Sequence, residues 1–347
     1  MLLSSLRLSL RIPTVRPTAS IFYKATFTTS TKPIMSKNIL NWASKDGEFR
    51  RQTSSFRDNV SPDANATFAA EPDRYHLYIS YACPWAHRAL AVLKLKGLDS
   101  LIGLSVVDYY LGDKGWKFST NEECPGAIPD TVNNASYIRD LYFKANPDYE
   151  GRFTVPVLWD KKLKTIVNNE SSEIIRMFNS AFNAFLPEDK KAINFYPESL
   201  QKEIDDWNTP IYDNVNNGVY KSGFASTQEA YENNVFNVFT WLDKIEAHLA
   251  NTDYLVANTL TEADIRLWTT VIRFDPVYFG HFKCNIKGIE KDYPNILKWA
   301  RRIYQIPGLA ETVNMDHIKK HYYMSHLQIN PTGVVPISNG PDLSAAI

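Results

Sequence analysis

The chain has 347 residues, 44% of them hydrophobic, and 38 basic side chains balance 38 acidic ones, so the formal net charge is zero. This length suits two domains better than one, and the hydrophobic content is sufficient for packed cores. A neutral chain creates no overall field that would attract nucleic acid or an anionic membrane, so neither is an expected partner.

Residues 1–40 differ in composition from the rest of the chain. No Asp or Glu occurs before Asp46, whereas Arg7, Arg11 and Arg16 lie among Ser, Thr and Leu. This composition is typical of a mitochondrial transit peptide, and a disordered extension is the alternative. Translation from Met35 would give a cytoplasmic product. The apolar opening is interrupted by arginine, so it is too short to span a bilayer.

Residues 41–185 are predicted to form an α/β domain. After an irregular lead-in, residues 74–81 have the pattern of a strand, 84–96 that of a helix and 101–107 that of a second, buried strand. A helix that links two such neighbouring strands indicates a parallel β-α-β unit.

Cys83 lies between the first strand and the first helix. Pro84 is suited to the first helical position, which places Cys83 at the N-cap or in the first turn. Free backbone N–H groups and the helix dipole there favour the thiolate, so we expect a nucleophile. Ala86 stands where a dithiol oxidoreductase has its second cysteine, so an external thiol must resolve any mixed disulfide. The alternative is a buried cysteine that only packs.

The other two cysteines, Cys124 and Cys284, are expected to be structural. Three widely spaced cysteines can build neither a disulfide framework nor a zinc cluster. We therefore expect a reduced protein without a metal.

A long connection over residues 108–152 follows, rich in Gly and Pro, and such connections are often functional. Residues 153–159 and 163–167 have the pattern of two further strands. Pro156 cannot donate to a strand ladder, and a cis Val155–Pro156 bond is plausible. A helix then opens at Glu170 and Ser171.

Residues 194–330 are predicted to form an all-helical domain. Thr261 and Asp264 resemble a capping box, which we expect to be structural. Residues 331–347, rich in Pro, Gly and Ser, have the composition of a flexible tail. Apolar residues recur at helical spacing over residues 203–215, 227–249, 262–274 and 293–304.

Five segments together resemble one known family over residues 41–330. The chain resembles the glutathionyl-hydroquinone reductases, the Xi class of glutathione transferases, which includes fungal omega-like members. The resemblance implies a thioredoxin-like domain followed by a helical domain, and a homodimer. The segments are Tyr81-Ala82-Cys83-Pro84-Trp85-Ala86, Gly115-Trp116-Lys117-Phe118, Val155-Pro156-Val157-Leu158-Trp159, Asn217-Gly218-Val219-Tyr220-Lys221-Ser222-Gly223-Phe224-Ala225 and Arg273-Phe274-Asp275-Pro276-Val277-Tyr278-Phe279.

The resemblance also implies roles for residues of the first domain. Cys83 would be the nucleophile, Trp116 would pack near glutathione, and Val155 would exchange main-chain hydrogen bonds with the cysteinyl part. Glu170 and Ser171 would hold the γ-glutamyl end, because a carboxylate pairs with its ammonium while a hydroxyl and helix-start amides receive its carboxylate. The alternative is that Glu170 and Ser171 only cap their helix.

In the second domain, the resemblance makes Tyr220 and Tyr278 the phenols that face the second substrate. A phenol can donate to a hydroxyl oxygen and can supply a proton. Arg273 and Asp275 could instead form an ordinary ion pair. His87 lies one turn after the nucleophile and could favour its thiolate, but we expect it to point elsewhere.

The implied activity is removal of glutathione from aromatic S-glutathionyl-hydroquinones through a cysteinyl–glutathione mixed disulfide. Hydroquinone and glutathione disulfide would be released, with glutathione as a substrate and no metal. A general omega-like thiol transferase or dehydroascorbate reductase, using the same cysteine, is the nearer alternative. A non-catalytic interaction module that keeps the fold is the other.

Overall fold

The structure, a computed structural model, describes residue 44 and residues 46–347. The predicted transit peptide or extension, residues 1–40, lies outside the described residues. Within the described part, no helix is both long enough and apolar enough to cross a bilayer.

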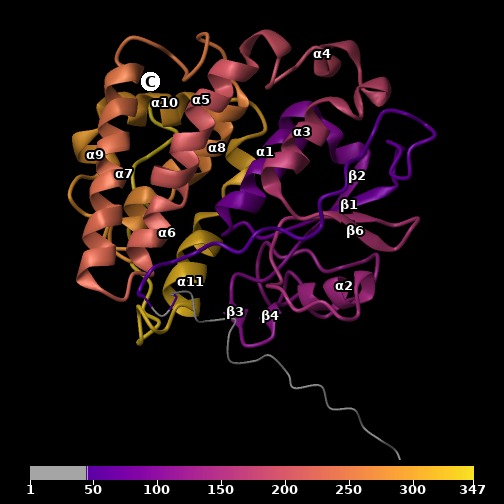
Figure 1. The fold of residues 1–347 in the computed structure, drawn as a ribbon, viewed down its shortest axis with the longest axis horizontal. Helices are drawn as coiled ribbons and strands as arrows, with labels where there is room; N and C mark the ends of the chain where they lie inside the picture. The colour runs from indigo at the N-terminus through magenta and orange to yellow at the C-terminus, as the bar shows by residue number, and fades with distance from the viewer. Residues whose placement is uncertain (1–43, 45) are drawn as a thin grey trace, which may run out of the picture. The chain divides into compact units, whose positions relative to one another are not determined.

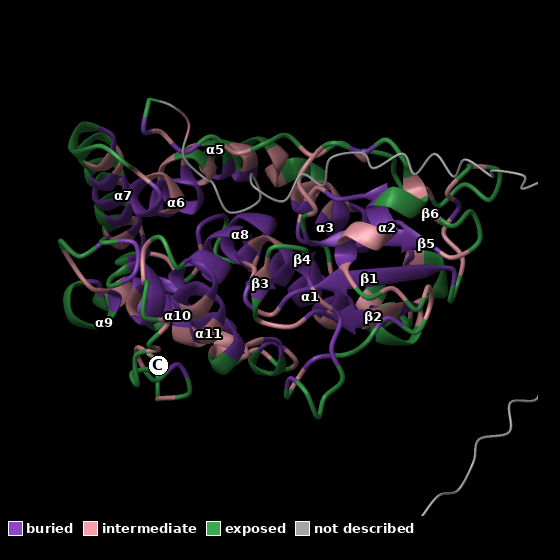
Figure 2. Cartoon of the chain, turned by 90° about the horizontal axis from the view of Figure 1, so that it is seen from below, coloured by how far each residue is buried: buried purple, intermediate pink, exposed green. Residues whose placement is uncertain are grey.

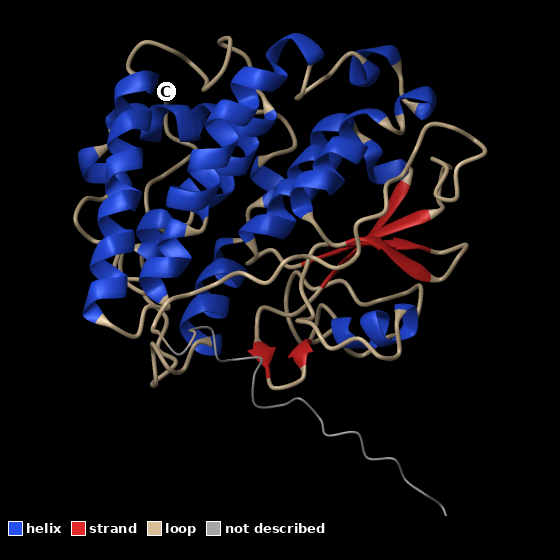
Figure 3. Cartoon of the chain, in the orientation of Figure 1, coloured by secondary structure: helices blue, strands red, loops and turns tan. Residues whose placement is uncertain are grey.

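Strands and short helices occupy the first half of the described chain, and helices the second (Figure 3). In chain order the elements are β1 (Tyr75–Ile79), α1 (Pro84–Lys96), β2 (Ile102–Val106), β3 (Leu111–Gly112), β4 (Gly115–Trp116), α2 (Ile138–Ala145), β5 (Val157–Asp160), β6 (Thr165–Asn168), α3 (Ser171–Ser180), α4 (Glu188–Lys191), α5 (Gln201–Ile211), α6 (Gly218–Gly223), α7 (Gln228–Leu249), α8 (Glu262–Val271), α9 (Ile289–Asp292), α10 (Pro294–Tyr304) and α11 (Met315–Ser325).

A four-stranded sheet has the order β2-β1-β5-β6. β1 and β2 are parallel, with Tyr75 opposite Ile102, so the predicted β-α-β unit is confirmed. β5 runs antiparallel to both β1 and β6. The result is the mixed sheet of a thioredoxin-like domain, as expected.

Helix α1 is buried on almost every side. It packs against α3 above the sheet and also contacts α8 of the helical part (Figure 1). Small residues such as Ala89 and Ala91, both without exposed surface, allow this close packing. The buried residues gather in β1, α1 and α8 (Figure 2). The N-terminus of α1, where Cys83 stands, is therefore rigidly supported from both sides.

The strand predicted over residues 153–159 is shorter in the structure. Only Val157–Asp160 pairs, as β5, because Pro156 has no N–H for the ladder. The Val155–Pro156 bond is cis, as expected. The residues before it run outside the sheet and are free to line a pocket.

Two predicted helices end earlier than expected. α5 ends at Ile211 and α8 at Val271, and π-helical turns follow at Tyr212–Asn216 and Phe274–Tyr278. Each turn lies at or just after a proline, Pro210 or Pro276, which cannot donate the regular helical hydrogen bond. By contrast, α7 and α10 match their predicted ranges within one residue, and the Thr261–Asp264 capping box is confirmed.

Some of the structure has no counterpart in the predicted elements. The connection 108–152 holds β3, β4 and α2, and α11 follows the last predicted helix. Residues 331–347 form no helix or strand. They are nevertheless tied to the helices, since Lys319 Nζ donates to the carbonyls of Pro336 and Ile337.

Candidate active site

Cys83 occupies the N-cap of α1, as the sequence predicts. Its backbone is extended, with φ −76° and ψ 117°, and Pro84 takes the first helical position. Its side chain is partly exposed, and Sγ lies 3.5 Å from the carbonyl oxygen of Val155, to which the thiol donates. The sulfur therefore sits between a helix N-terminus and the segment that precedes β5.

The expected ionisation of Cys83 needs correction. Burial raises the pKa of the thiol above its ordinary value, although hydrogen bonds from the Ala86 and Trp85 amides and the charges of Arg273 and Arg51 lower it. The sequence analysis counted only the helix N-terminus, and the apolar walls that outweigh it come from distant segments. Cys83 is thus a protonated thiol near neutral pH, with cations nearby that favour its ionisation.

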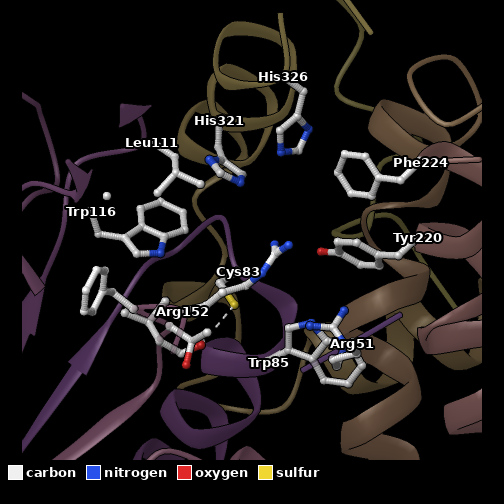
Figure 4. Close-up of a pocket in the computed structure, with 14 residues that line it drawn as sticks. Arg51, Cys83, Trp85, Leu111, Trp116, Arg152, Tyr220, Phe224, His321 and His326 are labelled. Carbon is white, nitrogen blue, oxygen red and sulfur yellow. Dashed lines mark hydrogen bonds between the residues drawn. The ribbon is translucent and has the colours of Figure 1, made fainter. Parts of the chain in front are cut away.

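A pocket opens over the sulfur, called here the Cys83 pocket. Figure 4 shows Cys83 at its floor, Trp116 on one wall, and Tyr220 and Phe224 on the wall opposite. Its walls come from both domains, so the site exists only where the two meet. The lining residues are Arg51, Cys83, Trp85, Leu111, Gly115, Trp116, Arg152, Phe153, Thr154, Val155, Tyr220, Phe224, His321 and His326.

A second, more polar pocket adjoins the first and contains the predicted pair Glu170 and Ser171. We call it the Glu170 pocket. Residues common to both pockets, among them Val155, make the two hollows neighbours. Its lining residues are Arg51, Gln52, Thr53, Ser54, Arg57, Trp85, Thr154, Val155, Pro156, Asn169, Glu170, Ser171 and Tyr212.

Glu170 caps α3 and also lines the Glu170 pocket. Its carboxylate accepts from the Ser172 amide at 3.1 Å and from Ser54 Oγ at 3.0 Å, and Ser171 begins the helix. The capping role weighed as the alternative is therefore present. It leaves room for a ligand, because a carboxylate offers about four acceptor positions.

Trp116 and Val155, the other two residues predicted to meet glutathione, both line the Cys83 pocket. The Trp116 ring stacks on His321, with ring centroids 4.7 Å apart and planes at 29°. Trp116 belongs to β4, a short strand inside the long connection, which explains why that connection exists.

The two predicted phenols differ in position. Tyr220 lines the Cys83 pocket, whereas Tyr278 has no exposed surface and does not line it. Tyr322 joins them, with its hydroxyl 2.5 Å from that of Tyr220 and 3.1 Å from that of Tyr278. Tyr278 therefore reaches the pocket only through Tyr322, which corrects the expectation that it faces the substrate directly.

Burial raises the pKa of all three phenols, of Tyr278 and Tyr322 well above the ordinary value. They remain neutral hydrogen-bond donors at physiological pH. Tyr322 was missed because it lies about a hundred residues from Tyr220, outside the five motifs. Its aromatic neighbourhood, His321-Tyr322-Tyr323, was the available signal.

Arg51 is a second site residue that the sequence analysis missed. Its guanidinium lies 4.2 Å from the centroid of Trp85 and 5.1 Å from that of Tyr220, while Nε donates to Asn217 Oδ1 at 2.7 Å. One terminal nitrogen is buried without a hydrogen-bond partner among the described residues. A cation therefore stands where the two pockets meet, beside the sulfur whose thiolate it favours.

Arg273 and Asp275 do not form the ion pair considered above. Arg273 is fully buried and donates to the carbonyls of Tyr81 at 2.8 Å and Ala82 at 3.0 Å. Asp275 instead accepts from the amides of Ile289 and Glu290. Arg273 thus ties the helical domain to the loop that carries Cys83.

His87 points away from the sulfur, as expected. Its Nε2 lies 2.7 Å from Thr312 Oγ1 and its Nδ1 3.2 Å from Arg273. Burial and the charge of Arg273 hold the pKa of His87 well below its ordinary value, so it carries no charge to stabilise a thiolate.

Cys124 and Cys284 are buried free thiols. Burial raises the pKa of Cys284 to about 12, which suits a packing role and not a nucleophile. Over residue 44 and residues 46–347, no group of three or more His, Cys, Asp or Glu side chains could hold a metal ion.

Comparison with known proteins supports the same class of site. The family profile "Glutathione S-transferase, N-terminal domain" matches residues 82–181, and "Glutathione S-transferase, C-terminal domain" matches residues 228–302. A thioredoxin-like sheet, a cysteine at the first helix and an appended helical domain fit both profiles. The chain belongs to the glutathione S-transferase family.

Individual relatives narrow this assignment. The glutathionyl-hydroquinone reductase YqjG of Escherichia coli is 53% identical over 306 residues, 86% of this chain and 92% of that protein. The crystal structure of the transferase Xi from Phanerochaete chrysosporium is 56% identical with a TM-score of 0.83, over 85% of this chain and 94% of that one. The chain thus falls in the Xi class, and the resemblance seen in the sequence is confirmed.

A glutathione-bound neighbour bears on the ligand. The glutathione-bound structure of YqjG is 50% identical to this chain with a TM-score of 0.78, covering 88% of this chain and 97% of that one. Glutathione is thereby supported as the ligand of the paired pockets.

Proposed function

We propose that this protein is a glutathionyl-hydroquinone reductase, which removes glutathione from aromatic S-glutathionyl-hydroquinones and releases hydroquinone and glutathione disulfide. One observation carries the proposal. Cys83 lies where a polar pocket suited to glutathione meets an aromatic pocket suited to a flat ring. A conjugate that spans both pockets would place its C–S bond at the thiol.

Glutathione would occupy the Glu170 pocket. The Glu170 carboxylate pairs with the ligand ammonium, while the Ser171 hydroxyl and the first amides of α3 receive the α-carboxylate. The main chain of Val155 binds the cysteinyl part, which brings the ligand sulfur to Cys83. The hydroquinone ring then lies in the Cys83 pocket, between Trp116 and Tyr220.

The reaction proceeds in two displacements. The Cys83 thiolate attacks the glutathione sulfur and forms an S–S bond; the electrons of the broken C–S bond go to the ring carbon, which takes up a proton and leaves as hydroquinone. A second glutathione, as its thiolate, attacks the mixed disulfide, gives glutathione disulfide and restores the Cys83 thiolate. Glutathione sulfur is oxidised to the disulfide as the ring carbon is reduced.

The three phenols would serve the proton that the ring carbon needs. Tyr278 and Tyr322 together can orient Tyr220, so that the Tyr220 hydroxyl donates into the pocket. Because their raised pKa values keep all three protonated, they can hold a hydroquinone oxygen and act as a general acid.

Replacement of the nucleophile tests the proposal. We expect Cys83→Ser to lower release of menadiol from glutathionyl-menadiol by at least about a thousandfold while the fold survives. Wild-type protein quenched during turnover should carry glutathione on Cys83, detected by peptide mass spectrometry. His248→Asn, in a helix that lines neither pocket, is the control. Full reductase activity in Cys83→Ser would remove the mechanism.

A general omega-like thiol transferase is the second candidate, favoured by the lone cysteine without a partner at Ala86. Both activities pass through the same mixed disulfide, so the substrate decides. Rates with glutathionyl-menadiol, hydroxyethyl disulfide and dehydroascorbate separate them. We expect the conjugate to give the highest kcat/KM, because the walls of the Cys83 pocket are aromatic. A non-catalytic module would turn over none of the three.

We further propose that the protein is a mitochondrial homodimer, which the composition of residues 1–40 and the family resemblance support. Phe236 on α7 is 60% exposed, as an apolar side chain at a subunit contact would be in an isolated protomer. Mass spectrometry of the N-terminus from isolated mitochondria tests the targeting. Light scattering tests the dimer, and a single-chain mass would contradict it.

A further inference from the structure

His321 is a pocket residue that the mechanism above does not use. It stands on α11, is 7% exposed, and lines the Cys83 pocket between Trp116 and His326 (Figure 4). A polar side chain buried to this degree and open only to a pocket calls for a ligand partner.

The contacts of the ring assign its tautomer. Nδ1 lies 3.0 Å from the carbonyl oxygen of Tyr109, which can only accept, so Nδ1 carries the proton. Ser325 Oγ, 3.4 Å from the same nitrogen, is the more distant contact and itself accepts from the Leu111 amide. Nε2 is left with a lone pair, and no described residue donates to it.

The ring is also fixed in charge and direction. Burial lowers the pKa of His321 to about 4, so the imidazole is neutral at physiological pH and Nε2 keeps its lone pair. Stacking on Trp116 and an edge contact with Tyr322 hold the ring plane. The pocket therefore presents one fixed acceptor at His321 and, across it, the hydroxyl of Tyr220.

We propose that His321 Nε2 accepts a hydrogen bond from a ring hydroxyl of the conjugate and thereby selects the reduced, hydroxyl-bearing ring over quinone or ether forms. A quinone carbonyl or an ether oxygen has no hydrogen to donate, so it would set two lone pairs against each other in a buried site. The inference rests on the proposed function and adds a determinant of specificity to it.

Binding measured without turnover tests this role. In a Cys83→Ser background, calorimetry under reducing conditions compares glutathionyl-menadiol with its dimethyl ether, with His321 intact or replaced in Cys83→Ser/His321→Asn. The amide of asparagine can retain the hydrogen bond to Tyr109 while the Nε2 acceptor is lost. Cys83→Ser/His248→Asn is the matched control.

With His321 present we expect the hydroquinone conjugate to bind about tenfold more tightly than the ether, and with asparagine the ratio to fall to about two. An unchanged ratio in the asparagine variant overturns the proposal, as does equal affinity for the two ligands when His321 is intact. The second comparison needs no folded His321 variant.

The two hypotheses fail separately. If wild-type protein releases no menadiol, the proposed reductase activity is wrong, whereas the ratio of affinities still reports on His321. If the reductase is active and the ratio is near one, only the selection by His321 is wrong.

Discussion

The Cys83 thiol is subject to opposing influences that a single residue cannot reveal. The neighbouring Pro84 correctly predicts the N-cap position. The net direction of the pKa shift depends on burial by walls from both domains and on the charge of Arg51, none of which is encoded near the motif. Position was therefore predictable from the sequence, and ionisation was not.

The reactivity of Cys83 should follow this raised pKa. We expect the rate of alkylation by iodoacetamide to climb with pH and to reach its midpoint above the ordinary pKa of a cysteine, because the thiolate reacts and burial disfavours it. Arg51→Met removes a nearby positive charge, so the midpoint should move higher still. Arg50→Met, an exposed neighbour, serves as the control. A midpoint below the free-cysteine value would contradict the correction made here.

Helix α8 illustrates how far one cap can matter. Asp264 is fully buried and accepts from the Thr261 amide at 3.0 Å, the Leu255 amide at 2.9 Å and the Trp299 indole at 3.0 Å. A capping pair read from the sequence thus also fastens a loop and a second helix.

Loss of this carboxylate should be costly. We expect Asp264→Ala to lower the free energy of unfolding by about 3 kcal/mol, because several buried donors lose their acceptor. Asp140→Ala removes the corresponding residue of the half-exposed capping box on α2 and should cost about 1 kcal/mol. Urea denaturation of both variants measures the difference, and equal losses would refute the argument.

Helix α11 escaped prediction for a physical reason. Its buried positions include His317, Lys319, His321 and Ser325, so burial on this helix does not produce an apolar stripe. The periodicity rule detects helices whose inner face is hydrophobic. It therefore worked for α7 and α10, and it missed the helix that brings polar groups to the pocket.

Across the whole molecule, Arg273 connects the two domains at the nucleophile loop. The charge is fully buried and supplies donors to Tyr81, Ala82 and Thr269 carbonyls. The sequence marked Arg273 only as half of a possible ion pair, because its partners are backbone atoms and these leave no signature in a sequence.

Arg273→Met should separate the two domains at this point. We expect the free energy of unfolding to fall by about 3 kcal/mol as three buried carbonyls lose their donor. Reductase kcat should fall on the order of a hundredfold, since the loop of Cys83 shifts. Denaturation and steady-state kinetics measure these effects, with Lys298→Met, an exposed change on α10, as the control. Unaltered kcat in a destabilised variant would show that the clamp does not position the sulfur.

Arg51 and Ser54 have a consequence for how this protein is handled in the laboratory. Both precede residue 82, where the recognisable transferase profile starts, yet they wall the Glu170 pocket. A version trimmed to the profile would retain its reactive sulfur while missing one side of the seat for its tripeptide. Expression boundaries chosen by homology alone would thus yield a folded but poorly binding product.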